Sequence, residues 1–155
     1  MRTASTMIVG FNFKKIAVER KKKLIKGMKV RYDMDLKEVY EESSRLSSGG
    51  STVLGFAFEF SVDYNPDIVS LKILGTVNYM LPQDEAKKVL DLWKTTKKLP
   101  KDVSIPVINN ILDRCNIKAL ELEQDMALPS HIPMPSLATP TTSKKDTAEA
   151  EKYIG

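Results

Sequence analysis

Four segments of the chain alternate apolar and polar residues, a period of two that places successive side chains on opposite faces of a β-strand. These segments lie at residues 9–18, 30–37, 54–64 and 69–79. In the first segment the alternation changes phase at Lys14-Lys15, which predicts a β-bulge. The pattern predicts four strands that share one apolar face, and that face needs a covering layer.

The links before and after the third segment carry turn-forming residues. Asn65-Pro66-Asp67 separates the third segment from the fourth. It favours a tight turn because Asn and Asp hydrogen-bond the nearby backbone and Pro fixes φ. These two segments are therefore expected to form an antiparallel hairpin. Ser47-Ser48-Gly49-Gly50, ahead of the third segment, is expected to be a flexible link.

Helical periodicity replaces the alternation in the second half of the chain. A first helix is predicted to begin at Pro82, a residue favoured in the first turn, and to end at Leu99-Pro100. A second and longer helix is predicted to begin at Asp102 or Ser104, with Pro106 in its opening turn. The apolar stripes are Ala86, Val89, Leu90 and Trp93 on the first helix, and Ile108, Ile111, Leu112, Cys115, Ala119, Leu122 and Met126 on the second.

The expected fold class is α+β: a four-stranded antiparallel sheet with two helices packed on one face. From Leu128 onward, prolines are frequent enough to hold the chain extended. Residues 138–155 are polar and nearly free of large apolar side chains, so they are predicted to form a disordered tail. The predicted domain therefore spans residues 7–137.

The composition lacks residue types that many enzyme active sites require. Cys115 is the one cysteine and His131 the one histidine, which excludes an intramolecular disulfide, a cysteine metal cage and a two-histidine acid–base pair. No apolar run approaches the roughly 18 residues of a membrane span, and no signal peptide is evident. We expect a cytoplasmic protein without membrane insertion that is not an enzyme, with no catalytic, cofactor-binding or metal-binding residues and no cofactor.

Two smaller candidates have ordinary explanations as well. Cys115 and His131 could form a nucleophile and base, but Cys115 lies on an apolar helical stripe, where a cysteine is usually a small buried hydrophobe. Asp33 and Asp35 share the polar face of a strand and could chelate a hard cation. Alternating charge on an exposed strand explains the two aspartates equally well.

The net charge of +4 is unevenly distributed along the chain. Residues 1–31 contain ten Lys or Arg and one acid, whereas residues 32–155 carry a net negative charge. One interpretation is phosphate binding, with RNA or the ribosome as partner. The other is a solvated hairpin turn between the first and second strands. The candidate nucleic-acid contacts are Arg20, Lys21, Lys22, Lys23, Lys26 and Lys29.

The third strand carries a long apolar row from Leu54 to Tyr64, with Phe56, Phe58 and Phe60 at its centre. A row of this kind is normally core under helices. Two helices with narrow stripes leave open a second interpretation, in which part of the row is a surface for self-association or for unfolded chains.

The order of these elements resembles the SecB family of export chaperones and its SecB-like relatives. The strand at Phe11–Val18 resembles the family's first strand, and the hairpin over 53–79 resembles its long central hairpin. The helix at Ile108–Met126 is similar to the main helix, and Met126–Leu137 is similar to the Leu-x-Leu-x-Pro segment that closes the domain.

The resemblance implies ATP-independent holding of unfolded or nascent polypeptides in apolar grooves, by a homo-oligomer that is a dimer or tetramer. SecB proteins are acidic and present carboxylates to the export motor, whereas this chain is basic at its N-terminal end, and no motor-binding residue is carried over. The first helix, with its Lys-Lys ending, looks like an insertion. The client contacts that the resemblance implies are Phe56, Phe58, Phe60, Leu128, Ile132 and Met134.

Three functional hypotheses follow, and they differ in what they bind. The first is a SecB-like chaperone for unfolded polypeptide clients. The alternative is a basic accessory protein on RNA or the ribosome, and the third is a structural subunit whose apolar row is an interface. Salt separates the first two, because phosphate contacts weaken steeply as salt rises whereas apolar capture holds or strengthens.

Overall fold

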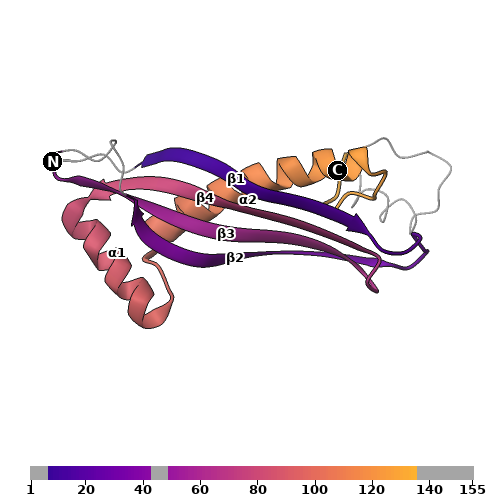
Figure 1. Ribbon diagram of the computed structural model, residues 1–155, viewed down its shortest axis with the longest axis horizontal. Coiled ribbons are helices and arrows are strands. Elements are labelled where there is room, and N and C mark those ends of the chain that lie inside the picture. The colour runs from indigo at the N-terminus through magenta and orange to yellow at the C-terminus, as the bar shows by residue number, and fades with distance from the viewer. Residues whose placement is uncertain (1–6, 43–48, 136–155) are drawn as a thin grey trace. The chain divides into compact units, whose positions relative to one another are not determined.

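A computed structural model describes residues 7–42 and 49–135 of the chain (Figure 1). It confirms the α+β class and the four-stranded antiparallel sheet with two helices. The predicted tail at 138–155 lies outside the described residues. The elements in chain order are β1 (Met7–Arg20), β2 (Lys29–Glu42), β3 (Ser51–Asn65), β4 (Val69–Pro82), α1 (Gln83–Thr96) and α2 (Lys101–Asp125).

The strand order is β1-β4-β3-β2, with every neighbouring pair antiparallel. β3 and β4 form the predicted hairpin at the centre, whereas β1 and β2 lie at opposite edges. The interpretation of residues 21–28 as a hairpin turn between β1 and β2 is therefore wrong. The charged strands lie at the edges of the sheet, and the most apolar strands lie at its centre. Each central strand has a hydrogen-bonded neighbour on both sides.

The β1–β2 connection instead crosses the turned end of the β3–β4 hairpin. The backbone N–H groups of Lys21 and Lys22 donate to the carbonyl oxygen of Ile68 at 2.7 and 3.3 Å. These bonds fix the start of the crossover to the hairpin. The crossover carries the chain from one edge of the sheet to the other.

The β-bulge predicted at Lys14-Lys15 is confirmed, because the β1–β4 register shifts between Phe13 and Lys15. The β1–β4 register also shifts between Ile8 and Gly10, which was not predicted. A further shift that was not predicted lies on β2 between Leu36 and Glu38. It returns the β2 side chains to phase with β3, so that Val39 is buried opposite Phe56. Each bulge preserves the apolar face of its strand across one extra residue.

One face of the sheet forms the core. The apolar row of β3 lies in register with the buried residues of β4; Phe56 pairs with Val77, and Phe60 pairs with Ile73. Ala86, Val89 and Trp93 of α1 are buried as well. The buried part of the β3 row comprises Leu54, Phe56, Phe58, Phe60, Val62 and Tyr64.

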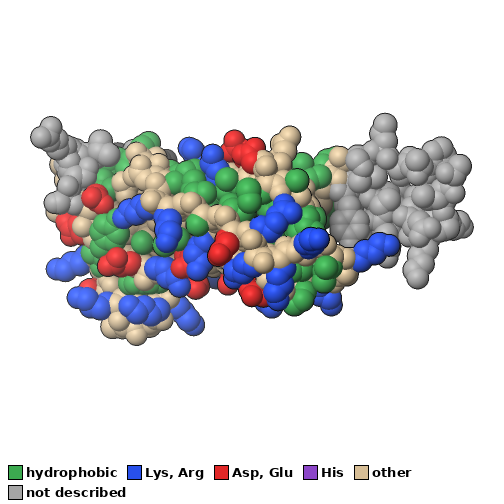
Figure 2. Space-filling model, turned by 45° about the vertical axis from the view of Figure 1, so that its right-hand side comes forward, with side chains coloured by type: hydrophobic (Ala, Val, Ile, Leu, Met, Phe, Trp, Pro, Cys, Tyr) green, Lys and Arg blue, Asp and Glu red, His purple; other side chains and the backbone are tan. Residues whose placement is uncertain are grey.

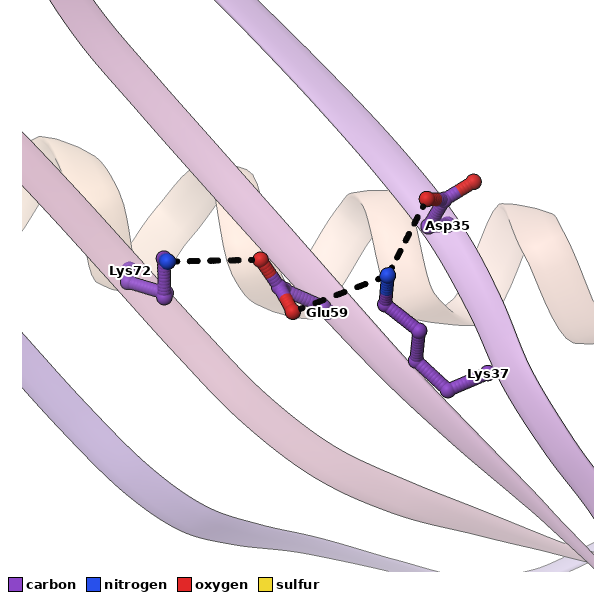
Figure 3. A network of polar contacts seen from close by, with 4 residues as sticks. All are labelled: Asp35, Lys37, Glu59 and Lys72. Carbon is purple, nitrogen blue, oxygen red and sulfur yellow. Dashed lines mark hydrogen bonds and ion pairs between the residues drawn. The ribbon is translucent and has the colours of Figure 1, made fainter.

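The opposite face of the central strands carries a network of charged side chains. Glu59 alternates with Phe58 and Phe60, so its side chain lies on that face. It joins Lys37 at 3.8 Å and Lys72 at 3.6 Å, and Lys37 also reaches Asp35 at 3.3 Å (Figure 3). These contacts bring together charged side chains of β2, β3 and β4. Asp35 therefore has a lysine as its partner.

The helix boundaries differ slightly from the predicted ones. α1 ends at a left-handed Lys97 (φ 58°), whose backbone N–H donates to the carbonyl of Trp93 at 2.9 Å. α2 begins at Lys101, and the carbonyl of Pro100 accepts the N–H groups of Val103 and Ser104. Pro106 therefore lies in the second turn and not in the opening turn.

The chain divides into two compact units, Met1–Asn116 and Ile117–Gly155. The first unit holds the sheet, α1 and the first part of α2. The second holds the last turns of α2 and the segment that follows them.

Gly75 of β4 lies where a side chain would collide with two neighbours. A Cβ atom placed there would come within 2.3 Å of the carbonyl oxygen of Asn12 and 2.6 Å of the ring of Phe58. Gly75→Val is expected to lower the free energy of unfolding by about 3 kcal/mol, since backbone and core ring must both move. Urea unfolding followed by circular dichroism measures this loss. A Gly75→Val protein as stable as the parent would contradict the β1–β4 register.

Candidate functional site

An open groove of about 420 Å³ lies in the first unit, where β2, the end of α1 and the start of α2 meet. β2 contributes alternate side chains that face the helices, with Met34 and Leu36 half-buried. Trp93 from α1 and Ile108 from α2 complete the apolar lining. The full lining is Met34, Asp35, Leu36, Trp93, Lys97, Lys98, Leu99, Ser104 and Ile108.

The groove has an apolar floor because apolar side chains of β2, α1 and α2 line it together. Leu36 pairs with Phe58 and Met34 pairs with Phe60, so both β2 side chains lie on the core face of the sheet at its edge. The core-face side chains of β3 are buried, whereas these edge residues are half-exposed. The result is an extension of the core that solvent reaches.

One side of the groove is formed by the unpaired edge of β2. Within residues 7–42 and 49–135, β2 pairs only with β3. Its outer N–H and C=O groups are therefore open to another extended chain, as in recognition by strand addition. A bound strand would place every second side chain toward the groove.

Two lysines form the rim at the end of α1. The Lys97 ammonium lies 5.4 Å from the centre of the Trp93 ring, a cation–π contact that holds it beside the groove. Lys98 follows it and is exposed. The groove therefore combines an apolar floor with a cationic edge.

The phenylalanines proposed as client contacts do not line this groove. Phe56, Phe58 and Phe60 are at most 1% exposed and form the core face of β3. An unfolded chain does not reach them while the layer that covers them stays in place. Their burial confirms the core interpretation of the β3 row, and more accessible apolar side chains lie one strand away on β2.

The other three proposed client contacts belong to the second unit. Leu128 is buried, Ile132 is half-buried and Met134 is 43% exposed. The backbone N–H of Leu128 donates to the carbonyl of Glu123, which closes the end of α2. A role of these residues in client contact remains a prediction.

His131 pairs with Glu123 in this second unit. Its backbone N–H donates to Oε1 of Glu123 at 3.1 Å, and its Nδ1 lies 2.8 Å from Oε2. Both side chains are at most 2% exposed. The pair fixes the segment after α2 to the helix itself, and this gives His131 a structural role that its sequence context did not indicate.

The basic cluster lies at the crossover between β1 and β2. Lys21 forms an ion pair with Asp67 at 2.8 Å, which raises the pKa of the Lys21 ammonium and lowers the pKa of the Asp67 carboxyl. Lys22, Lys23 and Lys26 are exposed around it, whereas Arg20 and Lys29 end the adjoining strands. One of the six predicted phosphate contacts is thus engaged with a carboxylate.

Cys115 is fully buried on α2, and burial raises the pKa of its thiol to about 12. At pH 8 only about one thiol in ten thousand is then ionised, and thiolate is the reactive form. We expect no reaction of the native protein with a thiol reagent over an hour, and complete reaction in denaturant. Absorbance of the released thiolate measures both. Rapid labelling of the native protein would contradict the burial of Cys115.

Neither a membrane-crossing helix nor a metal-binding cluster is found in the described part of the chain. No helix there is long and apolar enough to span a bilayer. No group of three or more His, Cys, Asp or Glu side chains converges there, and Asp33 and Asp35 gather no further ligands.

The groove itself was missed by the sequence analysis. Its lining comes from three elements, and neither the edge position of β2 nor the angle between the helices is visible in a linear pattern. The available signal was that Tyr32, Met34 and Leu36 form an apolar row on a strand whose alternate residues at 31–37 are charged. An edge strand with such a row has a face that the core does not fully use.

The comparisons with known proteins agree with this fold. No family model matches the sequence, and no curated protein matches it either. A search of solved structures finds the Mycobacterium tuberculosis Rv1957 SecB-like chaperone, in complex with a ChAD peptide from the Rv1956 HigA1 antitoxin. The TM-score is 0.50 at 10% identity, over 88% of this chain and 93% of that one. The chain thus has a fold similar to that of a SecB-like chaperone.

Proposed function

We propose that this protein is an ATP-independent chaperone that holds unfolded or nascent polypeptides in an apolar groove, without enzymatic activity. The observation that carries the proposal is the groove beside β2, where apolar side chains and an open strand edge lie together. The fold similarity to a chaperone solved with a bound peptide supports it. Assembly into a homo-oligomer is part of the proposal, since clients longer than one groove then gain avidity.

The two features of the groove suit an unfolded chain better than a folded partner. An extended chain satisfies its backbone polar groups along the β2 edge and buries every second side chain. Each fully buried large apolar side chain contributes about 1.5–3 kcal/mol, so two or three of them give micromolar affinity after the ordering cost. Affinity of this size allows both capture and release.

Suppression of light scattering from an unfolding client tests the proposal. A stoichiometric amount of the protein is expected to suppress aggregation equally at low and high salt, because apolar burial is not screened. The double substitution Met34→Glu and Ile108→Glu is expected to abolish suppression. A matched control, Ile25→Glu, changes an exposed apolar residue in the β1–β2 connection. Suppression that survives the groove substitutions would overturn the proposal.

The same experiment distinguishes the nucleic-acid hypothesis. If the basic cluster at the crossover is the functional surface, the purified protein carries RNA that high salt releases. Suppression would then be absent, and Lys22→Glu with Lys23→Glu would abolish RNA binding. Multi-angle light scattering on the same sample measures the oligomer mass.

A further inference from the structure

The end of α1 and the start of α2 concentrate positive charge beside the groove. Residues 94–101 contain four lysines and no acid. In the described part of the chain, none of these four ammonium groups forms an ion pair with a carboxylate. Figure 2 shows Lys and Arg side chains at the lower left, with Asp and Glu side chains nearby. The four lysines are Lys94, Lys97, Lys98 and Lys101.

Helix stability explains only part of this charge. Lys94 and Lys97 lie at the C-terminus of α1, where cations interact favourably with the helix dipole. Lys98 lines the groove and lies in the connection that follows α1. Lys101 is the first residue of α2, where the dipole is positive and a cation is unfavourable. Asp102 is the single acid in that first turn. Asp35 is the one acid among the residues that line the groove, and it pairs with Lys37 at 3.3 Å, so lysine charge exceeds acid charge there.

The chemistry of the groove selects a polypeptide over a nucleic acid. Its floor consists of aliphatic side chains and Trp93, which is only 9% exposed and has Lys97 beside its ring. Base stacking needs an open aromatic face, which the groove does not present. A large apolar side chain fits the floor, and carboxylates on its neighbours reach the lysines.

We propose that this groove prefers extended polypeptide segments in which acidic residues flank a large apolar side chain. This inference rests on the proposed function and deepens it, because it specifies the client class. The apolar side chain occupies the floor between Leu36 and Ile108. The flanking carboxylates pair with Lys98 and Lys101 while the backbone adds to the β2 edge.

Trp93 supplies the probe, because it is the one tryptophan of the chain and it lines the groove. Three tryptophan-free peptides share a Leu-Phe centre and differ only in their flanks, which are Glu, Gln or Lys. Titration of the full-length protein is followed by Trp93 fluorescence. The Glu-flanked peptide is expected to bind about ten-fold more tightly than the Gln-flanked one at low salt, and the Lys-flanked one more weakly. One molar salt, with a screening length of about 3 Å, is expected to erase the difference.

A pair of substitutions separates charge selection from folding. Lys98→Glu with Lys101→Glu reverses two exposed charges, and the acid at position 101 lies in the first turn of α2, where it stabilises the helix. A thermal transition followed by circular dichroism shows that the variant is folded. This variant is expected to lose the ten-fold preference for Glu flanks, so that the ratio of its affinities for the Glu- and Gln-flanked peptides falls to one or below. The control, Lys22→Glu with Lys23→Glu, makes the same charge change at the crossover and is expected to keep the preference.

Each unfavourable outcome identifies what has failed. Equal affinity for the Glu- and Gln-flanked peptides would overturn the charge preference and leave the chaperone proposal standing. An equal loss of preference in the crossover control would overturn the assignment to Lys98 and Lys101. A fluorescence change with oligouridylate, abolished by Lys98→Glu with Lys101→Glu, would assign the groove mouth to nucleic acid. No response to any peptide together with no suppression of aggregation would overturn both proposals.

Discussion

Phe58→Asp is expected to leave the protein largely unfolded at room temperature. The Phe58 ring is 1% exposed at the centre of β3, and it lies 5.4 Å from the ring of Phe11 and directly over Gly75. An aspartate there loses the buried ring and brings in a charge without a partner. A buried unpaired charge costs several kcal/mol, and a large-to-small change at an aromatic core position costs about 3–5 kcal/mol more. Their sum approaches the 5–15 kcal/mol that is typical of a whole domain.

Circular dichroism and size-exclusion chromatography measure this outcome. The variant is expected to lose its strand signal and its cooperative thermal transition. Ile25→Asp is the matched control, because Ile25 is 52% exposed in the β1–β2 connection and its replacement is expected to change the free energy of unfolding by less than about 0.5 kcal/mol. A folded Phe58→Asp protein with an unchanged melting temperature would show that the β3 register is wrong.

The β3 row could be predicted because its periodicity is strong and local. Alternation over residues 54–64 assigns one face to the core regardless of what the strand pairs with. The same holds for the bulge at Lys14-Lys15, which is a phase change within one segment. Local pattern thus determined which side chains are buried.

The strand order could not be predicted from the alternating pattern. Several strand pairings fit that pattern equally well, and the pattern does not show which of them is the most stable. β1 and β2 are sequence neighbours with compatible alternation, and a turn between them was the simpler expectation. The structure pairs β1 with β4 and carries residues 21–28 across the hairpin end, with Lys21 held to Asp67 and Ile68. The groove follows from that order, because it exists only where β2 is an edge strand.

The buried pair in the second unit was equally invisible in the sequence. Glu123 falls in a series of buried α2 residues spaced four apart, where the pattern would place an apolar side chain. Its partner His131 lies eight residues downstream, after the helix has ended. A polar group at a core position requires a specific partner, and the sequence does not identify which residue that partner is.

Glu123→Leu is expected to detach the segment that follows α2. The substitution leaves both the backbone N–H and the Nδ1 of His131 without their acceptor in a buried site. Loss of one partner of a buried polar pair costs about 3 kcal/mol, since the remaining group keeps its desolvation penalty. Hydrogen exchange at residues 126–135 measures the effect, and amides of the first unit serve as the internal control. We expect protection in the segment to fall about a hundred-fold, the factor that about 3 kcal/mol corresponds to.

The double variant Glu123→Leu with His131→Leu tests whether the pair acts as a unit. Each single substitution leaves a buried polar partner, whereas the double substitution removes both side chains, so it is expected to be less damaging than the sum of the singles by at least about 1 kcal/mol. Additive losses would mean that Glu123 and His131 contribute separately, through packing alone. A Glu123→Leu protein whose segment stays fully protected would show that the Leu128 N–H bond to the Glu123 carbonyl suffices to close the helix end. The coupling therefore measures how much of the closure depends on the side-chain pair.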